Sequence, residues 1–159
     1  MNPLNYDDLQ EIVLRLLVAT VVGAILGIDR DIHKKPAGLR VLALVSLGAC
    51  LVTVCSLAAV SEEGKNAAEA TLRVVQGIIG GIGFLGGGVI LRSTRSEEVH
   101  GLTTAASIWV SAALGTSCGL GQWRVALIGF AAAMIVLWIG GPIEKAIIRR
   151  FVRSDEPKS

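Results

Sequence analysis

Charged residues gather between the first two apolar segments, where their types offer the clearest candidate chemistry. The cluster consists of Asp29, Arg30, Asp31, Lys35, Gly38 and Arg40. Because a hard cation such as Mg²⁺ prefers carboxylate oxygens, Asp29 and Asp31 are weak candidate metal ligands, with Glu97 and Glu98 as further oxygen donors. The spacing fixes no geometry. Two interpretations stay open: a functional site on the cytoplasmic face, or charges that only orient the chain in a membrane.

Hydroxyl residues begin a later apolar segment and extend the candidate site. Thr103 and Thr104 follow Gly101, where their side chains are expected either to cap a helix or to join the charged cluster. Ser107 and Ser111 have no histidine within local reach, so neither is predicted to be a nucleophile. The sequence therefore predicts no catalytic residue and no enzyme.

Nucleotide and cofactor sites are also not expected. Gly81, Gly83 and Gly86 spell Gly-x-Gly-x-x-Gly, but the match lies inside an apolar run and not at a strand-to-helix turn. Gly64 and Lys65 are followed by Asn66, so this pair does not belong to a phosphate-binding loop of the Gly-Lys-Ser/Thr type.

The composition predicts a protein that resides in lipid. Of 159 residues, 52% are hydrophobic and 18% charged, with nineteen glycines and a net charge of +2. The mean hydropathy is +0.63. These values exclude a soluble globular or disordered chain, and the mild charge argues against nucleic-acid binding.

Five apolar runs predict an all-α membrane domain over residues 1–141. The expected spanning helices are 12–28, 41–60, 74–91, 102–118 and 125–141, each long enough to cross a bilayer. Eleven Lys and Arg lie in alternate connections and in the tail, against three on the opposite side. This asymmetry predicts an external N-terminus and a cytoplasmic C-terminus. Residues 142–159 are expected to form a basic, amphipathic cytoplasmic tail.

Small residues at helical spacing predict the faces where helices pack, because close backbone approach replaces the hydrophobic effect in lipid. The candidate packing residues are Gly23, Gly27, Gly81, Gly83, Phe84, Gly86, Gly87, Ser107, Trp109, Ser111 and Gly115. The third segment has glycines on every side, so it is either surrounded by neighbours or locally broken. Gly83→Leu is expected to force two helices apart.

A basic residue near the start of the first segment has a nearby acid. Arg15 lies four residues after Glu11, and the two are expected to form a structural ion pair at the membrane interface. A role for Arg15 in an ion path is the alternative.

Four sequence blocks, spaced along most of the chain, carry a family resemblance. The blocks are 23–31, 35–40, 81–90 and 101–109. Together they resemble the MgtC/SapB family of bacterial membrane proteins. The resemblance implies a multi-pass protein of the bacterial inner membrane with five spanning helices. It also implies links to growth in scarce magnesium, acid tolerance and, in some pathogens, survival inside macrophages.

Particular positions match the motifs of that family and are candidate functional residues on this ground. They are Asp29, Arg30, Gly38, Arg40, Gly83, Phe84, Gly86, Gly101, Thr103, Thr104 and Trp109. Three features depart from the family pattern: Asp29 replaces the usual glutamate, Gly87 a usual alanine, and Val41 and Leu42 the usual polar pair. Many members also have a soluble C-terminal domain, which we expect this chain to lack.

The expected function is non-enzymatic. The chain is predicted to affect ion homeostasis by contacting other membrane proteins or by forming a homo-oligomer, with the lipid bilayer as its surroundings and no cofactor or nucleotide. The alternative is a small transporter or channel for Mg²⁺ or protons, lined by a broken helix over residues 77–88.

Overall fold

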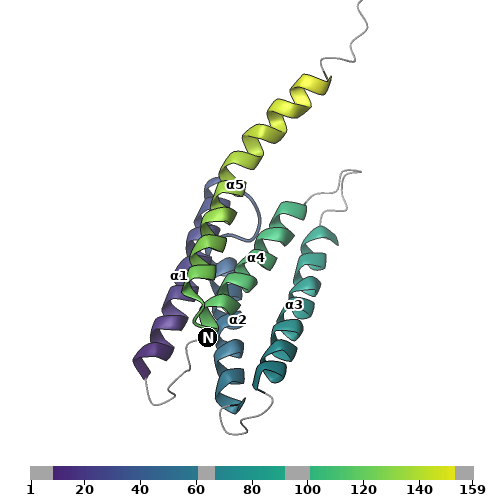
Figure 1. Cartoon of the computed structure of the whole chain (residues 1–159). Coiled ribbons are helices and arrows are strands. Elements are labelled where there is room, and N and C mark those ends of the chain that lie inside the picture. Colours follow the sequence, from purple (N-terminus) through teal and green to yellow (C-terminus); the bar gives the residue numbers. More distant parts are fainter. Residues whose placement is uncertain (1–8, 61–66, 92–100, 153–159) are drawn as a thin grey trace, which may run out of the picture.

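The computed structural model describes residues 9–60, 67–91 and 101–152, and these residues form five helices and no strand. The helices are α1 (Leu9–Ile32), α2 (Leu39–Val60), α3 (Ala67–Leu91), α4 (Leu102–Gly119) and α5 (Trp123–Val152) (Figure 1). The prediction of an all-α chain is confirmed, and every expected segment lies within one of these helices. The expected segments were shorter than the helices, most of all for α1, α3 and α5.

Four of the helices, α1, α2, α3 and α5, are long and apolar enough to cross a membrane. The fourth predicted span, 102–118, does form a helix, but α4 is not among these candidate spans. α4 is the most enclosed helix: residues buried in it include Thr104, Ser107, Ser111 and Thr116. Because protein and not lipid surrounds much of α4, its sequence can carry more hydroxyl groups than a lipid-facing span.

Tight packing of α1, α2 and α4 forms the centre of the bundle. A Cβ atom built on Gly23 would lie 2.5 Å from the carbonyl oxygen of Leu42, and one on Gly119 would lie 2.7 Å from the Cβ of Thr53. Gly27 and Gly115 meet α2 backbone in the same way. The Oγ of Ser111 donates a hydrogen bond to the carbonyl oxygen of Leu42 across the same interface, at 2.8 Å.

This centre agrees with the prediction of small-residue packing faces on the first and fourth segments. Ser107, buried on α4, donates its hydroxyl to the Thr103 carbonyl oxygen within the helix. Trp109 is 47% exposed and lines a small hollow between α3 and α4. Trp109 therefore lies beside the contact of α3 with α4 and outside the buried centre.

The glycines of α3 behave differently from the prediction. Gly86 meets the Cβ of Ala105 at 3.4 Å, but a Cβ on Gly81, Gly83 or Gly87 would find nothing within 4 Å. Phe84 is 85% exposed. Within this chain, therefore, the prediction that Gly81, Gly83, Phe84 and Gly87 pack against other helices is wrong, and the reason given for the Gly83→Leu prediction does not hold.

The other interpretation of the glycine cluster, a broken helix, is also wrong. α3 is one uninterrupted α-helix from Ala67 to Leu91. Glycine lowers helix propensity without forcing a break, because helical dihedral angles are sterically allowed for it and its cost of about 1 kcal/mol relative to alanine is entropic.

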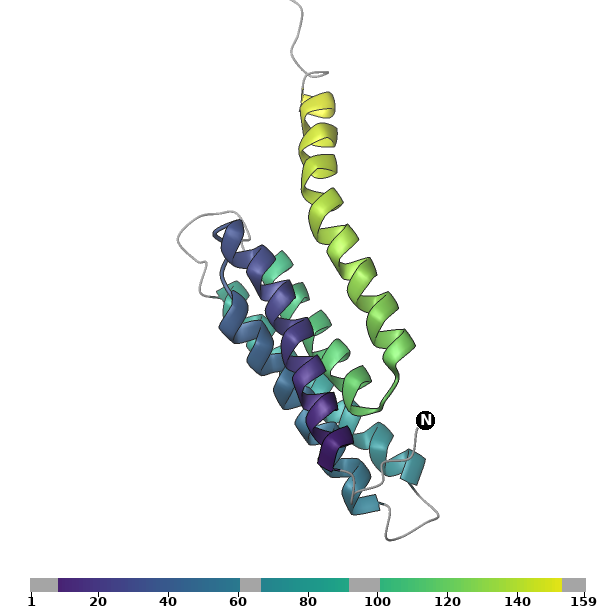
Figure 2. The same ribbon diagram turned by 90° about the vertical axis from the view of Figure 1, so that its left-hand side faces the viewer.

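α5 packs against α4 and continues beyond the expected end of the fifth segment. The helix runs without a break through Pro142 to Val152, so the expected boundary at 141 is not a helix end. Its C-terminal part projects past the other four helices in both views (Figure 1 and Figure 2). The last seven residues of the predicted tail, 153–159, lie outside the described part of the chain.

Candidate functional site at the start of α4

Two arginines of α1 lie at opposite ends of α4, because the two helices run antiparallel. Arg15 is beside the C-terminus of α4 and Arg30 beside its N-terminus; they are 0% and 1% exposed. Glycines with positive φ flank α4, Gly101 at 89° and Gly121 at 67°. Each end of α4 therefore has a glycine turn with a buried arginine beside it.

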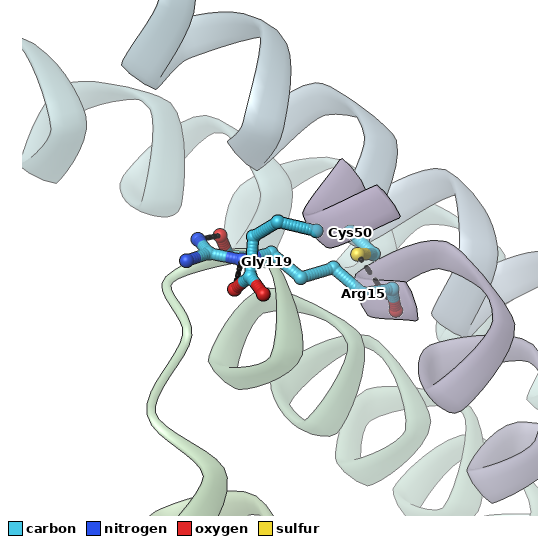
Figure 3. Close-up of polar contacts among 4 residues, drawn as sticks. Arg15, Cys50 and Gly119 are labelled. Atoms are coloured by element: carbon cyan, nitrogen blue, oxygen red, sulfur yellow. Dashed lines mark hydrogen bonds and ion pairs between the residues drawn. The ribbon is translucent and has the colours of Figure 1, made fainter. Parts of the chain in front are cut away.

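The Arg15 end is structurally satisfied. The Nε of Arg15 donates to Glu11 Oε1 at 2.8 Å, and its Nη1 donates to the carbonyl oxygen of Gly119 at 2.8 Å. Figure 3 shows the guanidinium reaching the end of α4, while the Sγ of Cys50 donates to the Arg15 carbonyl oxygen. A cation at a helix C-terminus is stabilised by the helix dipole. The predicted pair of Glu11 and Arg15 is confirmed.

The Arg30 end forms the candidate functional site. Nη2 of Arg30 donates a short hydrogen bond to the hydroxyl of Thr104. The Nε and Nη1 atoms are buried and have no hydrogen-bond partner in the described part of the chain. The prediction that Thr103 and Thr104 cap α4 is wrong, because the N-cap residue is Gly101 and no side chain caps it. Thr104 binds Arg30 instead.

The two carboxylates of the charged cluster point to different elements. Oδ1 of Asp29 accepts a hydrogen bond from Nε1 of Trp138 on α5 at 3.0 Å. Oδ2 of Asp31 accepts from the backbone N–H of Leu39, the first residue of α2, at 2.9 Å. Residues two apart on a helix do not face each other. The structure therefore does not bring Asp29 and Asp31 together as a cation site.

The other carboxylates expected as oxygen donors to a cation are not tested. Glu97 and Glu98 lie outside the described residues. Within the described ranges, no group of three or more His, Cys, Asp or Glu side chains is arranged to hold a metal ion. His33 is next to Asp29, with Nδ1 2.7 Å from its carbonyl oxygen and 3.5 Å from Oδ1.

The turn between α1 and α2 is tight. Lys34 and Ala37 have positive φ angles of 52° and 59°. Gly38 lies against the carboxylate of Asp31 so closely that a Cβ atom would overlap it. Since Asp31 binds the first backbone N–H of α2, Gly38 leaves room for the group that caps this helix.

Replacing Gly38 with alanine is expected to displace the Asp31 carboxylate from the start of α2. Loss of a cap costs about 1 kcal/mol, which for a chain of this size lowers Tm by about 3 °C. The measurement is thermal unfolding of the purified protein in detergent. Gly48→Ala is the matched control, because a Cβ at Gly48 on α2 meets nothing within 4 Å. Equal Tm values for the two variants would contradict the capping role.

A cavity of about 750 Å³ lies beside Arg30 and collects several of the predicted residues. Lys35, Thr103, Thr104 and Arg30 line it together with apolar side chains of α2 and α3. Arg40 is exposed on the first turn of α2 and does not line the cavity. The candidate residues therefore do not form one site. Some line the cavity, the two carboxylates bind other helices, and Arg40 lies on the surface.

Sequence reasoning missed Trp138 as a member of this site. Trp138 lies near the expected inner end of the segment 125–141, and Asp29 directly follows the expected inner end of 12–28, so the two were expected at a similar level of the membrane. That shared level was the available signal. The unmet donors of Arg30 gave no signal in the sequence, because a basic residue at the end of a span is ordinary.

Comparisons with known proteins give a consistent result. The model of the MgtC family matches residues 16–146. The chain is 42% identical over 129 residues to Protein SrpB of Synechococcus elongatus, covering 77% of this chain and 71% of that protein. It is 41% identical over 125 residues to Protein MgtC of Salmonella typhimurium, covering 79% of this chain and 49% of that protein. No solved structure matches.

Four helices long and apolar enough to cross a bilayer indicate a helical membrane protein. With the match over most of its length, the chain belongs to the MgtC family. The resemblance seen in the sequence blocks is therefore confirmed. The chain spans about half the length of Salmonella MgtC and 71% of SrpB.

Proposed function

We propose that this chain is a non-enzymatic, multi-pass protein of the bacterial inner membrane that affects ion homeostasis by contacting other membrane proteins or further copies of itself. Its N-terminus is outside and its C-terminus is in the cytosol. Growth at low magnesium or low pH is the expected setting, which the name of the relative MgtC and the family membership support.

The observation that carries this proposal is the open glycine surface of α3. Six glycines, at positions 77, 80, 81, 83, 87 and 88, have nothing within 4 Å of where a Cβ atom would lie. Each glycine costs a helix interior about 1 kcal/mol relative to alanine. In lipid that cost is offset where small residues allow another helix to approach closely. Among the described residues, no other helix approaches α3 at these six positions.

The packing of α1, α2 and α4 supports a function by contact with other proteins over a function in ion transport. Their backbones approach so closely at Gly23, Gly115 and Gly119 that no side chain fits between them. Asp29 and Asp31, the weak candidate ligands for a cation, are bound instead to Trp138 and to the start of α2.

Two leucines placed on the open surface test the proposal. Gly80→Leu with Gly83→Leu is expected to abolish restoration of growth at limiting magnesium in a deletion strain, while the purified protein keeps a normal Tm. The reason is that bulky side chains keep a partner helix away without meeting any helix of this chain.

A matched control uses lipid-facing positions that already have large side chains. Val136→Leu with Ile139→Leu on α5, both exposed, should leave growth unchanged. Full restoration of growth by the α3 double variant would contradict a contact role for this surface. Restoration lost together with a lowered Tm would also count against it, because the defect would then be one of folding.

A further inference from the structure

The guanidinium of Arg30 is buried, and most of its donors have no hydrogen-bond partner among the described residues. A guanidinium has five N–H donors. In Arg30 the Nη2 group binds Thr104, while Nε and Nη1, which carry three of these N–H groups, have no partner in the described residues. Asp29, the sequence neighbour of Arg30, accepts a hydrogen bond from Trp138 with its Oδ1. Burying a cation whose donors have no acceptors is strongly unfavourable, so a further acceptor would stabilise the Arg30 guanidinium.

The position of Arg30 places its positive charge beside a second positive charge, that of a helix N-terminus. Arg30 lies at the N-terminus of α4, where the unpaired backbone N–H groups give a partial positive charge. Gly101, the N-cap residue, supplies no side chain to neutralise it. Arg15 shows the contrast, because it lies at the negative end of the same helix and donates to a carbonyl oxygen there. An anion would offset both charges at the Arg30 end.

The cavity beside Arg30 has room for such an anion and walls that suit it. Its volume is about 750 Å³. Lys35 and Thr103, both exposed, add an ammonium and a hydroxyl to the lining around Arg30. A tetrahedral oxyanion has enough acceptor oxygens for a guanidinium fork, an ammonium and a hydroxyl together. The remaining wall is mostly apolar, including Val45 and Phe84.

We propose that this cavity binds a phosphate group, free or at the head of a phospholipid, with Arg30 as its anchor and Lys35 as a supporting cation. The site goes beyond the contact function proposed above, because it needs no second protein; of the open glycines of α3, only Gly88 is part of its lining. The two sources of phosphate differ in whether the apolar wall of the cavity is filled.

Thermal unfolding of the purified full chain in a neutral, non-phosphate detergent tests the proposal. The probes are inorganic phosphate and dihexanoyl phosphatidic acid, with dihexanoyl phosphatidylcholine as the control of equal chain length. A bound ligand raises Tm by mass action, by about 8 °C at a hundredfold excess over Kd. We expect a saturable rise with a phosphate probe and none with phosphatidylcholine.

The two phosphate probes separate the sources. A rise with inorganic phosphate means that the free anion suffices, and a rise with phosphatidic acid alone means that the ligand is a lipid headgroup. Either result supports the site. No rise with either probe, or an equal rise with phosphatidylcholine, overturns it.

Variants show whether the binding is at this cavity. Arg30→Met is expected to abolish the rise, since methionine has a similar shape and no donors. Lys35→Gln is expected to weaken the apparent affinity about fivefold. Lys34→Gln is the matched control: Lys34 is exposed, adjacent in sequence and outside the cavity lining, so its variant should bind as the parent does.

The lysine pair keeps the test decisive if Arg30→Met does not fold. A rise that persists in Arg30→Met, or that Lys34→Gln weakens as much as Lys35→Gln does, overturns the assignment to this cavity.

Discussion

Gly115→Leu is expected to remove most of the folded protein. A Cβ atom on Gly115 would lie 2.8 Å from the carbonyl carbon of Ser46, and backbone on a neighbouring helix cannot turn aside as a side chain can. Overpacking costs up to about 3 kcal/mol even where side chains can adjust. The measurement is the yield of monodisperse protein after detergent extraction, which should fall several-fold.

The matched control for Gly115→Leu is the same substitution at Gly83. A Cβ at Gly83 meets nothing within 4 Å, so this variant should extract like the parent protein. Equal yields for Gly115→Leu and Gly83→Leu would contradict the position of α4 at the centre of the bundle.

Arg15→Met is expected to cause the second large loss. The change leaves the carbonyl oxygen of Gly119 and the carboxylate of Glu11 without the donors that bind them. Breaking a buried ionic contact by removing one partner costs about 3 to 5 kcal/mol. For a chain of this length, Tm should fall by about 10 °C.

An exposed ion pair of the same spacing provides the control. Arg73 and Glu69 on α3 lie 2.6 Å apart, with side chains 75% and 64% exposed. An exposed pair of this kind contributes about 0.5 kcal/mol or less, so Arg73→Met should lower Tm by no more than about 2 °C. A similar small shift for Arg15→Met would show that Arg15 does not hold the end of α4.

The helices and the central packing could be predicted from the sequence, because both are local patterns. The length of the apolar runs predicted the five helical segments. Small residues spaced four apart identified Gly23, Gly27 and Gly115 as points of contact between helices. The pair of Glu11 and Arg15 followed from the same helical spacing.

The arrangement of the candidate site could not be predicted, because it depends on which helix end meets which. Asp29 and Asp31 are close in sequence, yet helix geometry turns one toward Trp138 and the other toward the start of α2. The glycines of α3 show the same limit: their spacing predicts a packing face, but not whether the helix that packs there belongs to this chain.

Ion flux across liposomes that contain the purified protein is the most direct test of a function through contact. The account predicts Mg²⁺ and proton flux equal to that of protein-free liposomes, with the parent chain and Asp29→Asn indistinguishable. Flux of either ion that the parent supports and Asp29→Asn abolishes would contradict it and would assign transport to this protein.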